Sequence, residues 1–308
     1  MTPVYLDTAR MLTQVAPLVF FGDTFALKGG TAINLFFRDM PRLSVDLDLV
    51  FVDPSLPRDE ALAKIGQALR DAAERLIRRG FQVHFPASAG VEAKLLVRRG
   101  RIEVKVEVNV VMRGTVMPVG RASLRPAARD ALMADVEIPV VSLDDVYAGK
   151  LVAALDRQHP RDLFDVMQLY AHEGITPGIR RAFVVYLACH NRPVHEVLYA
   201  SPRDIRHDYE RNFAGMTAEP IPLEALLQTR DRMMSDLQSG LGATERRFLL
   251  GLVGGEPMLE GLGIPHLEAL PAIRWKQRNL EELRIAQPKK YAEQFAALAG
   301  RWGGDSST

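Results

Sequence analysis

The spacing of apolar residues changes close to Ser142, and this change constrains the fold more than any other feature of the sequence. Before it, short strand-like apolar runs alternate with helical patterns, whereas after it almost every segment follows the helical period. Proline and glycine turns separate the later segments, at Pro160, Pro177, Pro193, Pro202, Pro220, Gly254-Gly255 and Pro265. The sequence therefore predicts an α/β domain over residues 1–141 and a mainly α-helical domain over 142–308.

The first half carries recognisable strand and helix patterns. They predict helices near 4–17 and 58–79, a helix opening at Thr31, and strands over 25–28, 44–52, 81–85, 92–98 and 102–111. In the last strand, valines at 104, 106, 108 and 110 alternate with polar residues, so one face is core and the other polar. The small polar tail 303–308 is expected to be disordered.

Composition limits the classes of protein that this chain can represent. The N-terminus lacks the basic and apolar regions of a signal peptide, and no apolar run approaches the ~18 residues of a membrane span. We therefore expect a soluble protein, with no membrane association. The one cysteine, Cys189, lies in an apolar stretch and indicates a core residue in a reducing compartment, which favours a cytoplasmic location.

The formal net charge of +1 gives no bulk signal for a polyanionic partner, so a nucleic-acid site would have to be a local patch. Residues 94–129 form one candidate, with nine basic residues against Glu103 and Glu107. A solvated strand-and-loop face explains the same residues equally well.

The segment Lys28-Gly29-Gly30-Thr31 ends a predicted strand and turns directly into a helix. Paired glycines allow backbone N–H groups to approach a ligand, and a helix N-terminus favours an anion such as a nucleotide phosphate. Thr31 could cap the helix or touch the ligand. A strand–Gly-Gly–helix segment alone is more often only a turn.

The segment Ser44-Val45-Asp46-Leu47-Asp48 follows shortly afterwards. In a strand, Ser44, Asp46 and Asp48 project to one face, with the aspartate Cα atoms about 7 Å apart. Repulsion makes such a pair costly unless a cation neutralises it, and Mg²⁺ prefers these hard oxygen ligands. The alternative is an acidic strand face without function.

A helix is predicted to begin at Ser142, which has the capping-box partner Asp145 three residues later. Lys150 falls within the apolar stripe of this helix, which is costly unless its ammonium reaches an anion; the alternative is that it snorkels to solvent. Asp162 and Asp165 are neighbours on the next helix, where they could orient Lys150 or Arg157, act as a base, or form a solvated face.

These segments together resemble a known family. Lys-Gly-Gly-Thr-Ala-x-Asn-Leu-Phe from Lys28, followed by Arg-x-Ser-x-Asp-x-Asp-Leu from Arg42, resembles the AbiEii/AbiGii toxins, a branch of the polymerase-beta-like nucleotidyltransferases. The resemblance continues through Lys150, through Arg161–Asp165 and through Arg274–Leu280. It implies a small mixed β-sheet flanked by helices and a third carboxylate from a neighbouring strand. Glu107 fits that position best, and Glu103 shares its face.

The resemblance also implies an activity. A nucleotide would pass from an NTP to an RNA acceptor, expected to be the 3′ end of tRNA, and block translation. The cognate antitoxin would be an AbiEi-type winged-helix protein. Two alternatives stay open: a protein or small-molecule acceptor, and a nucleotide-binding module without turnover. The expected catalytic residues are Asp46, Asp48, Glu107, Lys150, Asp162 and Asp165.

The expected metal ligands are Asp46, Asp48 and Glu107, which would hold Mg²⁺ or, in its place, Mn²⁺. Nucleotide binding is assigned to Lys28, Gly29, Gly30, Thr31, Ser44, Lys150 and Arg157. The seven histidines form no pair with metal-ligand spacing and receive no role.

Overall fold

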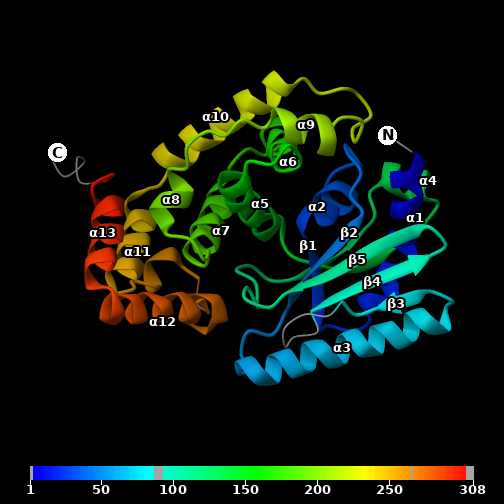
Figure 1. Cartoon of the computed structure of the whole chain (residues 1–308), viewed down its shortest axis with the longest axis horizontal. Helices are drawn as coiled ribbons and strands as arrows, with labels where there is room; N and C mark the ends of the chain where they lie inside the picture. The colour runs from blue at the N-terminus through cyan, green and yellow to red at the C-terminus, as the bar shows by residue number, and fades with distance from the viewer. Residues whose placement is uncertain (1–2, 87–92, 265, 303–308) are drawn as a thin grey trace. The chain divides into compact units, whose positions relative to one another are not determined.

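A computed structural model describes residues 3–86, 93–264 and 266–302 (Figure 1). The chain forms two compact units. The first comprises the described residues up to Val146 together with Phe213–Ile221, and the second comprises Tyr147–Asn212 and the residues from Pro222 onward. The expected disordered tail 303–308 and the expected break at Pro265 lie outside the described residues.

The first unit is built on one mixed seven-stranded sheet with the order β3-β4-β5-β2-β1-β7-β6. Strand β2 lies between β1 and β5, and it is antiparallel to β1 and parallel to β5. The mixed α/β fold expected from the sequence is thus confirmed. The strands are β1 (Phe25–Lys28), β2 (Asp46–Phe51), β3 (Gln82–His84), β4 (Lys94–Arg99), β5 (Ile102–Asn109), β6 (Gly120–Ser123) and β7 (Glu137–Val140).

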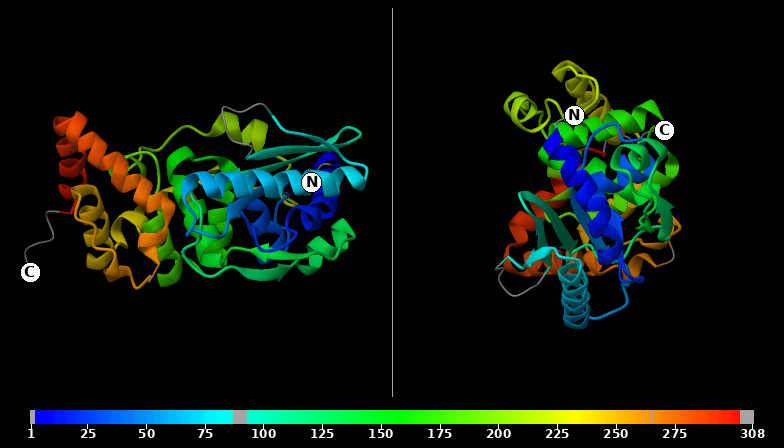
Figure 2. Two further views of the ribbon diagram at one scale, coloured as in Figure 1. Left: turned by 90° about the horizontal axis from the view of Figure 1, so that it is seen from below. Right: turned by 90° about the vertical axis from the view of Figure 1, so that its right-hand side faces the viewer.

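Helices cover the apolar side and one edge of this sheet. Helix α1 (Pro3–Val19) packs against β5, β2 and β7, and α3 (Arg58–Arg78) lies along the β3–β4 edge (Figure 2). The apolar residues of α1 and of the strands, including Leu12, Leu47 and Val106, are buried between them. This burial is the main stabilising term of the unit and leaves the opposite, polar side of β2 and β5 outside the core.

The sequence located most elements of the first unit within two or three residues but missed three of them. These are β6, α4 (Pro126–Leu132) and β7. Strand β6 has no apolar alternation, and Pro139 within β7 argues against a strand because proline cannot donate to the ladder. The expected strand 92–98 begins at Lys94 in the described chain, with residue 92 outside it.

The helix after β1 begins earlier than expected. Helix α2 (Gly29–Thr31) starts at Gly29 with Lys28 as its N-cap, and continues as a π-helix over Ala32–Phe37. Thr31 therefore lies inside the helix and does not cap it.

The second unit is helical, as the period of its sequence predicts, and its described residues contain no strand. Most of these helices start at or beside the prolines that punctuate the sequence. They are α5 (Leu143–Arg157, whose first turn belongs to the first unit), α6 (Pro160–Ala171), α7 (Pro177–Ala188), α8 (Val194–Leu198), α9 (Arg206–Asn212), α10 (Leu223–Ser239), α11 (Ala243–Gly254), α12 (Pro271–Ala286) and α13 (Pro288–Ala299), with short 3₁₀ turns at Glu260–Leu262 and Leu267–Ala269. Within the described chain, no helix has the length and apolarity needed to cross a bilayer.

Candidate nucleotidyltransferase site

The double-glycine turn lies directly against Asp48. Gly29 has a φ of +73°, a conformation that favours glycine, and a Cβ at this position would overlap Oδ2 of Asp48. A Cβ on Gly30 would stand 2.7 Å from Nη2 of Arg42. Gly29 is therefore required by its positive φ and by the Asp48 side chain, whose carboxylate lies at the N-terminus of α2, whereas the atom near Gly30 is the movable end of the Arg42 side chain.

Thr31 ties this turn to the start of β2. Its buried hydroxyl donates to the backbone carbonyl oxygen of Asp46 (2.5 Å) and lies 3.0 Å from the Ser44 hydroxyl. Arg42 is also buried and donates from Nη1 to the Leu43 carbonyl oxygen (2.9 Å). These contacts position the segment that leads into Asp46; the predicted contact of Thr31 and Ser44 with nucleotide stays a prediction.

Asp46, Asp48 and Glu107 share the polar side of the sheet. Leu47 and Leu49 are fully buried, so the half-buried aspartates point to the other side. In the parallel pairing of β2 with β5, Asp48 is the direct partner of Glu107. Side chains of directly paired strand residues lie on the same face, so the three carboxylates lie on one face of two adjacent strands.

The same register separates Glu107 from Glu103. Strand β2 begins at Asp46, which pairs with Lys105, so Glu103 lies beyond the end of the β2 ladder. Glu103 instead forms an ion pair with Arg98 of β4. The geometry favours Glu107 as the third carboxylate.

Sequence reasoning missed Lys105, which lies among the three acids. Its Nζ is 3.0 Å from Oε2 of Glu107, and it is the β-ladder partner of Asp46. Partial burial acts to lower the pKa of Lys105, but the hydrogen bond to Glu107 and the negative charges of Asp46 and Asp48 outweigh it and raise the pKa. The alternation in β5 already placed Lys105 on this face; only the strand pairing showed which acids it meets.

The donor chemistry of the face fits a divalent cation. Carboxylate oxygens are the preferred ligands of Mg²⁺ and Mn²⁺, and Asp46 and Asp48 would hold the ion. Among the described residues, however, no three His, Cys, Asp or Glu side chains converge closely enough to form a ligand set. Glu107 instead pairs with Lys105 through Oε2.

A second charged cluster lies in the second unit, around Lys150. The Lys150 ammonium is 2.7 Å from Oδ1 of Asp162 and 2.9 Å from Oδ2 of Asp165, and only 7% of its side chain is exposed. Arg157 makes two bonds to Asp162, 2.5 and 3.0 Å long. The buried lysine therefore reaches anions, as its place in the apolar stripe requires, and does not snorkel to solvent.

Asp162 and Asp165 are not a solvated face, because both are almost completely buried. Burial acts to raise the pKa of Asp162, but the charge of Lys150 and the bonds from Arg157 outweigh it and hold the pKa well below its usual range. A carboxylate held in its ionised form by two cations is a weak base. The geometry therefore favours orientation of Lys150 and Arg157 over a role as base for Asp162.

The helix that carries Lys150 begins as the capping pattern predicts. The Ser142 hydroxyl accepts from the backbone N–H of Asp145 (3.0 Å) and donates to its Oδ2 (2.9 Å). The buried Asp145 carboxylate also accepts from the backbone N–H groups of Val116 and Met117, each at 2.8 Å. Asp145 thus anchors a loop of the first unit, a role that no local pattern indicated.

The basic stretch 94–129 is partly used in internal pairs. Arg98, Lys105 and Arg121 form ion pairs with nearby glutamates, and Arg113 is buried. Arg99 stacks on the ring of Phe81, 3.7 Å from its centroid. The remaining exposed members of the stretch are too few to identify an RNA surface by themselves.

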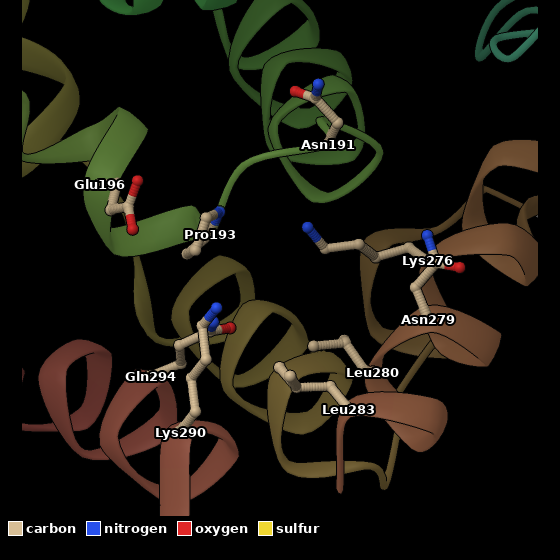
Figure 3. A pocket seen from close by; sticks show the side chains of 9 residues that line it. All are labelled: Asn191, Pro193, Glu196, Lys276, Asn279, Leu280, Leu283, Lys290 and Gln294. Carbon is tan, nitrogen blue, oxygen red and sulfur yellow. The ribbon is translucent and has the colours of Figure 1, made fainter. Parts of the chain in front are cut away.

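The second unit also contains a cavity of about 310 Å³ that is lined by no predicted site residue (Figure 3). Lys276 of α12 reaches into its wall and donates to the carbonyl oxygens of His190 (2.7 Å) and Arg192 (3.0 Å), just beyond the end of α7. Burial lowers the pKa of Lys276 to about 8. Within the segment Arg274–Leu280, Lys276 therefore holds the turn after α7, while Trp275 is 38% exposed.

The mixed sheet, with paired aspartates beside a double-glycine turn, has the arrangement of a nucleotidyltransferase. The chain belongs to the family of AbiEii nucleotidyl transferase toxins of type IV toxin–antitoxin systems, whose profile matches residues 10–279. The resemblance seen in the sequence is thereby confirmed. No curated protein sequence matches this chain.

One of two solved structures that match this chain has a similar fold. MenT4, a nucleotidyltransferase toxin from Mycobacterium tuberculosis H37Rv, is 19% identical with a TM-score of 0.60, covering 90% of this chain and 94% of its own. This similarity supports the mixed α/β fold described above. The CdnC:HORMA-deltaN complex from E. coli MS115-1 is 12% identical over 88% of this chain and 92% of the other, and its TM-score of 0.27 does not indicate a shared fold.

Proposed function

We propose that this protein transfers a nucleotide from an NTP to a hydroxyl group of an RNA, with the 3′ end of tRNA as the expected acceptor, and so blocks translation. Membership of a nucleotidyltransferase toxin family supports the transfer of a nucleotide. The observation that carries the proposal is the Asp48 carboxylate, which lies against Gly29 with Asp46 and Glu107 on the same sheet face. An NTP phosphate at the N-terminus of α2 would thus lie next to the paired aspartates.

In this proposal the residues of the first unit have separate tasks. Gly29 and Gly30 leave space for backbone N–H groups to meet phosphate oxygens, and Lys28 adds a positive charge at the end of β1. Asp46 and Asp48 would hold Mg²⁺ or Mn²⁺, which neutralises charge on the α-phosphate and lowers the pKa of the acceptor hydroxyl. A role of Lys150 and Arg157 toward the nucleotide stays a prediction.

Labelled NTPs incubated with total cellular RNA, protein and metabolites test the proposal. We expect label in the RNA fraction, at the 3′ ends of tRNA. Label in the protein or metabolite fraction would support one of the alternative acceptors, and binding of NTP without transfer would support a non-catalytic module. The expected regulatory partner is a winged-helix antitoxin of the AbiEi type, and co-purification of the two proteins tests that partnership.

Asp48→Asn and Glu103→Gln form a matched pair for the same assay. Both remove one carboxylate charge from the polar face of the sheet, but only Asp48 lies at the double-glycine turn. We expect Asp48→Asn to lose at least about 100-fold in transfer and Glu103→Gln to stay close to the parent protein. Circular dichroism melting curves check that both variants fold; full activity in a folded Asp48→Asn protein would overturn the site.

A further inference from the structure

Three charges of one sign on neighbouring strand positions need a counter-charge even when no nucleotide is bound. Asp46, Asp48 and Glu107 share one face, and like charges so close together destabilise the folded sheet. Lys105 supplies a positive charge at this place. Its ammonium lies 3.0 Å from Glu107, and its Cα is paired with that of Asp46.

We propose that Lys105 is an internal counter-ion that occupies the acidic site in place of the divalent cation and competes with it for Glu107. The proposal rests on the proposed function, because it requires the cation to bind at Asp46 and Asp48. It makes Lys105 a positioning residue, which decides how the carboxylates are arranged before the cation arrives.

Two observations favour competition over a merely structural ion pair. First, Oε2 of Glu107 pairs with Lys105, and Asp46, Asp48 and Glu107 share a face without forming, among the described residues, a group of three acids arranged to hold a metal ion. Second, the side chains of Lys105 and Glu107 are 34% and 46% exposed, so neither is locked in the core. A partly exposed pair contributes little to stability and can separate at low cost, unlike the buried pairs around Lys150.

Competition of this kind has a functional consequence. A lysine that shields the acids weakens cation binding by the free protein, so the site would be completed mainly when an NTP brings its own metal-bound phosphates. The displaced ammonium of Lys105 would then lie next to negative phosphate oxygens, which offsets the ion pair that it lost.

Titration of Mn²⁺ into the nucleotide-free protein by calorimetry tests the inference without any turnover. Lys105→Met should bind Mn²⁺ about tenfold more tightly, the size expected when one opposing charge a few ångströms away is removed. Lys105→Arg keeps the charge and should stay within about twofold of the parent. Lys64→Met is the net-charge control, since Lys64 is exposed on α3 and its ammonium lies 5.9 Å from the centroid of the Phe51 ring.

Thermal unfolding gives a second readout and guards against a folding defect. In EDTA, Lys105→Met should melt about 2–4 °C below the parent because the acids repel one another, and Mn²⁺ should restore most of the difference. Lys105→Gln serves in place of the methionine variant if the latter does not fold.

The outcomes distinguish a failure of the counter-ion proposal from a failure of the proposed function. Equal Mn²⁺ affinity in the parent and Lys105→Met, or weaker affinity in the variant, overturns the counter-ion proposal. Unchanged Mn²⁺ affinity with weakened NTP binding also overturns it, and assigns Lys105 to the phosphates instead. If Asp48→Asn binds Mn²⁺ as tightly as the parent, the cation site of the proposed function itself fails.

Discussion

Removal of the Lys150 ammonium should destabilise the protein strongly. Lys150→Met keeps the length and most of the volume of the side chain but leaves Asp165 and Asp162, 0% and 1% exposed, without the cation between them. Removing one partner of a buried ion pair lowers the free energy of unfolding by about 3–5 kcal/mol, because the remaining carboxylate stays charged in the core and has lost its counter-ion. For a unit of this size, that loss corresponds to about 6–20 °C in the unfolding midpoint.

Arg157 provides the matched control, because it binds the same Asp162 but its side chain is 61% exposed. Arg157→Met should cost clearly less than Lys150→Met, because the exposed arginine side chain loses less on removal and water can reach its side of the pair with the buried Asp162. Urea denaturation of both variants measures the two free energies of unfolding. Lys150→Met combined with Asp165→Leu should recover much of the loss, since an apolar pair can replace a buried ionic one. Equal, small effects of Lys150→Met and Arg157→Met would refute the assignment of the stabilising charge to the buried lysine.

Three further perturbations test other parts of the structure. Gly29→Ala should lower the free energy of unfolding by about 1–3 kcal/mol and abolish nucleotide transfer, because it strains a positive φ and pushes a methyl group into Asp48. Denaturant titration measures the loss of stability, and the NTP assay measures the loss of transfer. A stable, active variant would contradict the close packing of Gly29 against Asp48. Thr31→Val should lower the free energy of unfolding by about 1–2 kcal/mol, because it removes the hydroxyl that donates to the Asp46 carbonyl oxygen. Thr31→Ser keeps this hydroxyl and should keep the hydrogen bond. The pKa of Asp162 is depressed in the folded protein, so its contribution to stability is complete only well above 3.8 and is lost progressively as the pH falls from there toward the lowered folded pKa. The difference in unfolding free energy between the parent and Asp162→Asn should therefore shrink in acid, and a pH-independent difference would count against the pairing.

The sequence was informative wherever one short segment decides the structure. The alternation of apolar and polar residues placed Asp46, Asp48 and Glu107 on polar strand faces, since a strand turns successive side chains to opposite sides whatever its neighbours are. The helical period likewise placed Lys150 in an apolar stripe, where its burial required an anionic partner.

Pairings between distant segments could not be obtained in this way. The choice of Glu107 over Glu103 depends on the register of β2 against β5, which is formed by backbone hydrogen bonds between residues about 60 positions apart. Strands β6 and β7 were missed because Pro139 and the polar sequence of β6 give no local strand pattern, and only pairing with each other and with β1 makes them strands.

By itself the sequence determined the family, through its motifs, and it determined the order of most elements and the strand face of Asp46, Asp48 and Glu107, which follow from local backbone geometry. Only the tertiary structure decided which charges meet: Lys105 with Glu107, Lys150 with Asp162 and Asp165, and Gly29 with Asp48. Electrostatic and steric contacts of this kind depend on distances of a few ångströms between segments that the chain connects only through long intervening stretches.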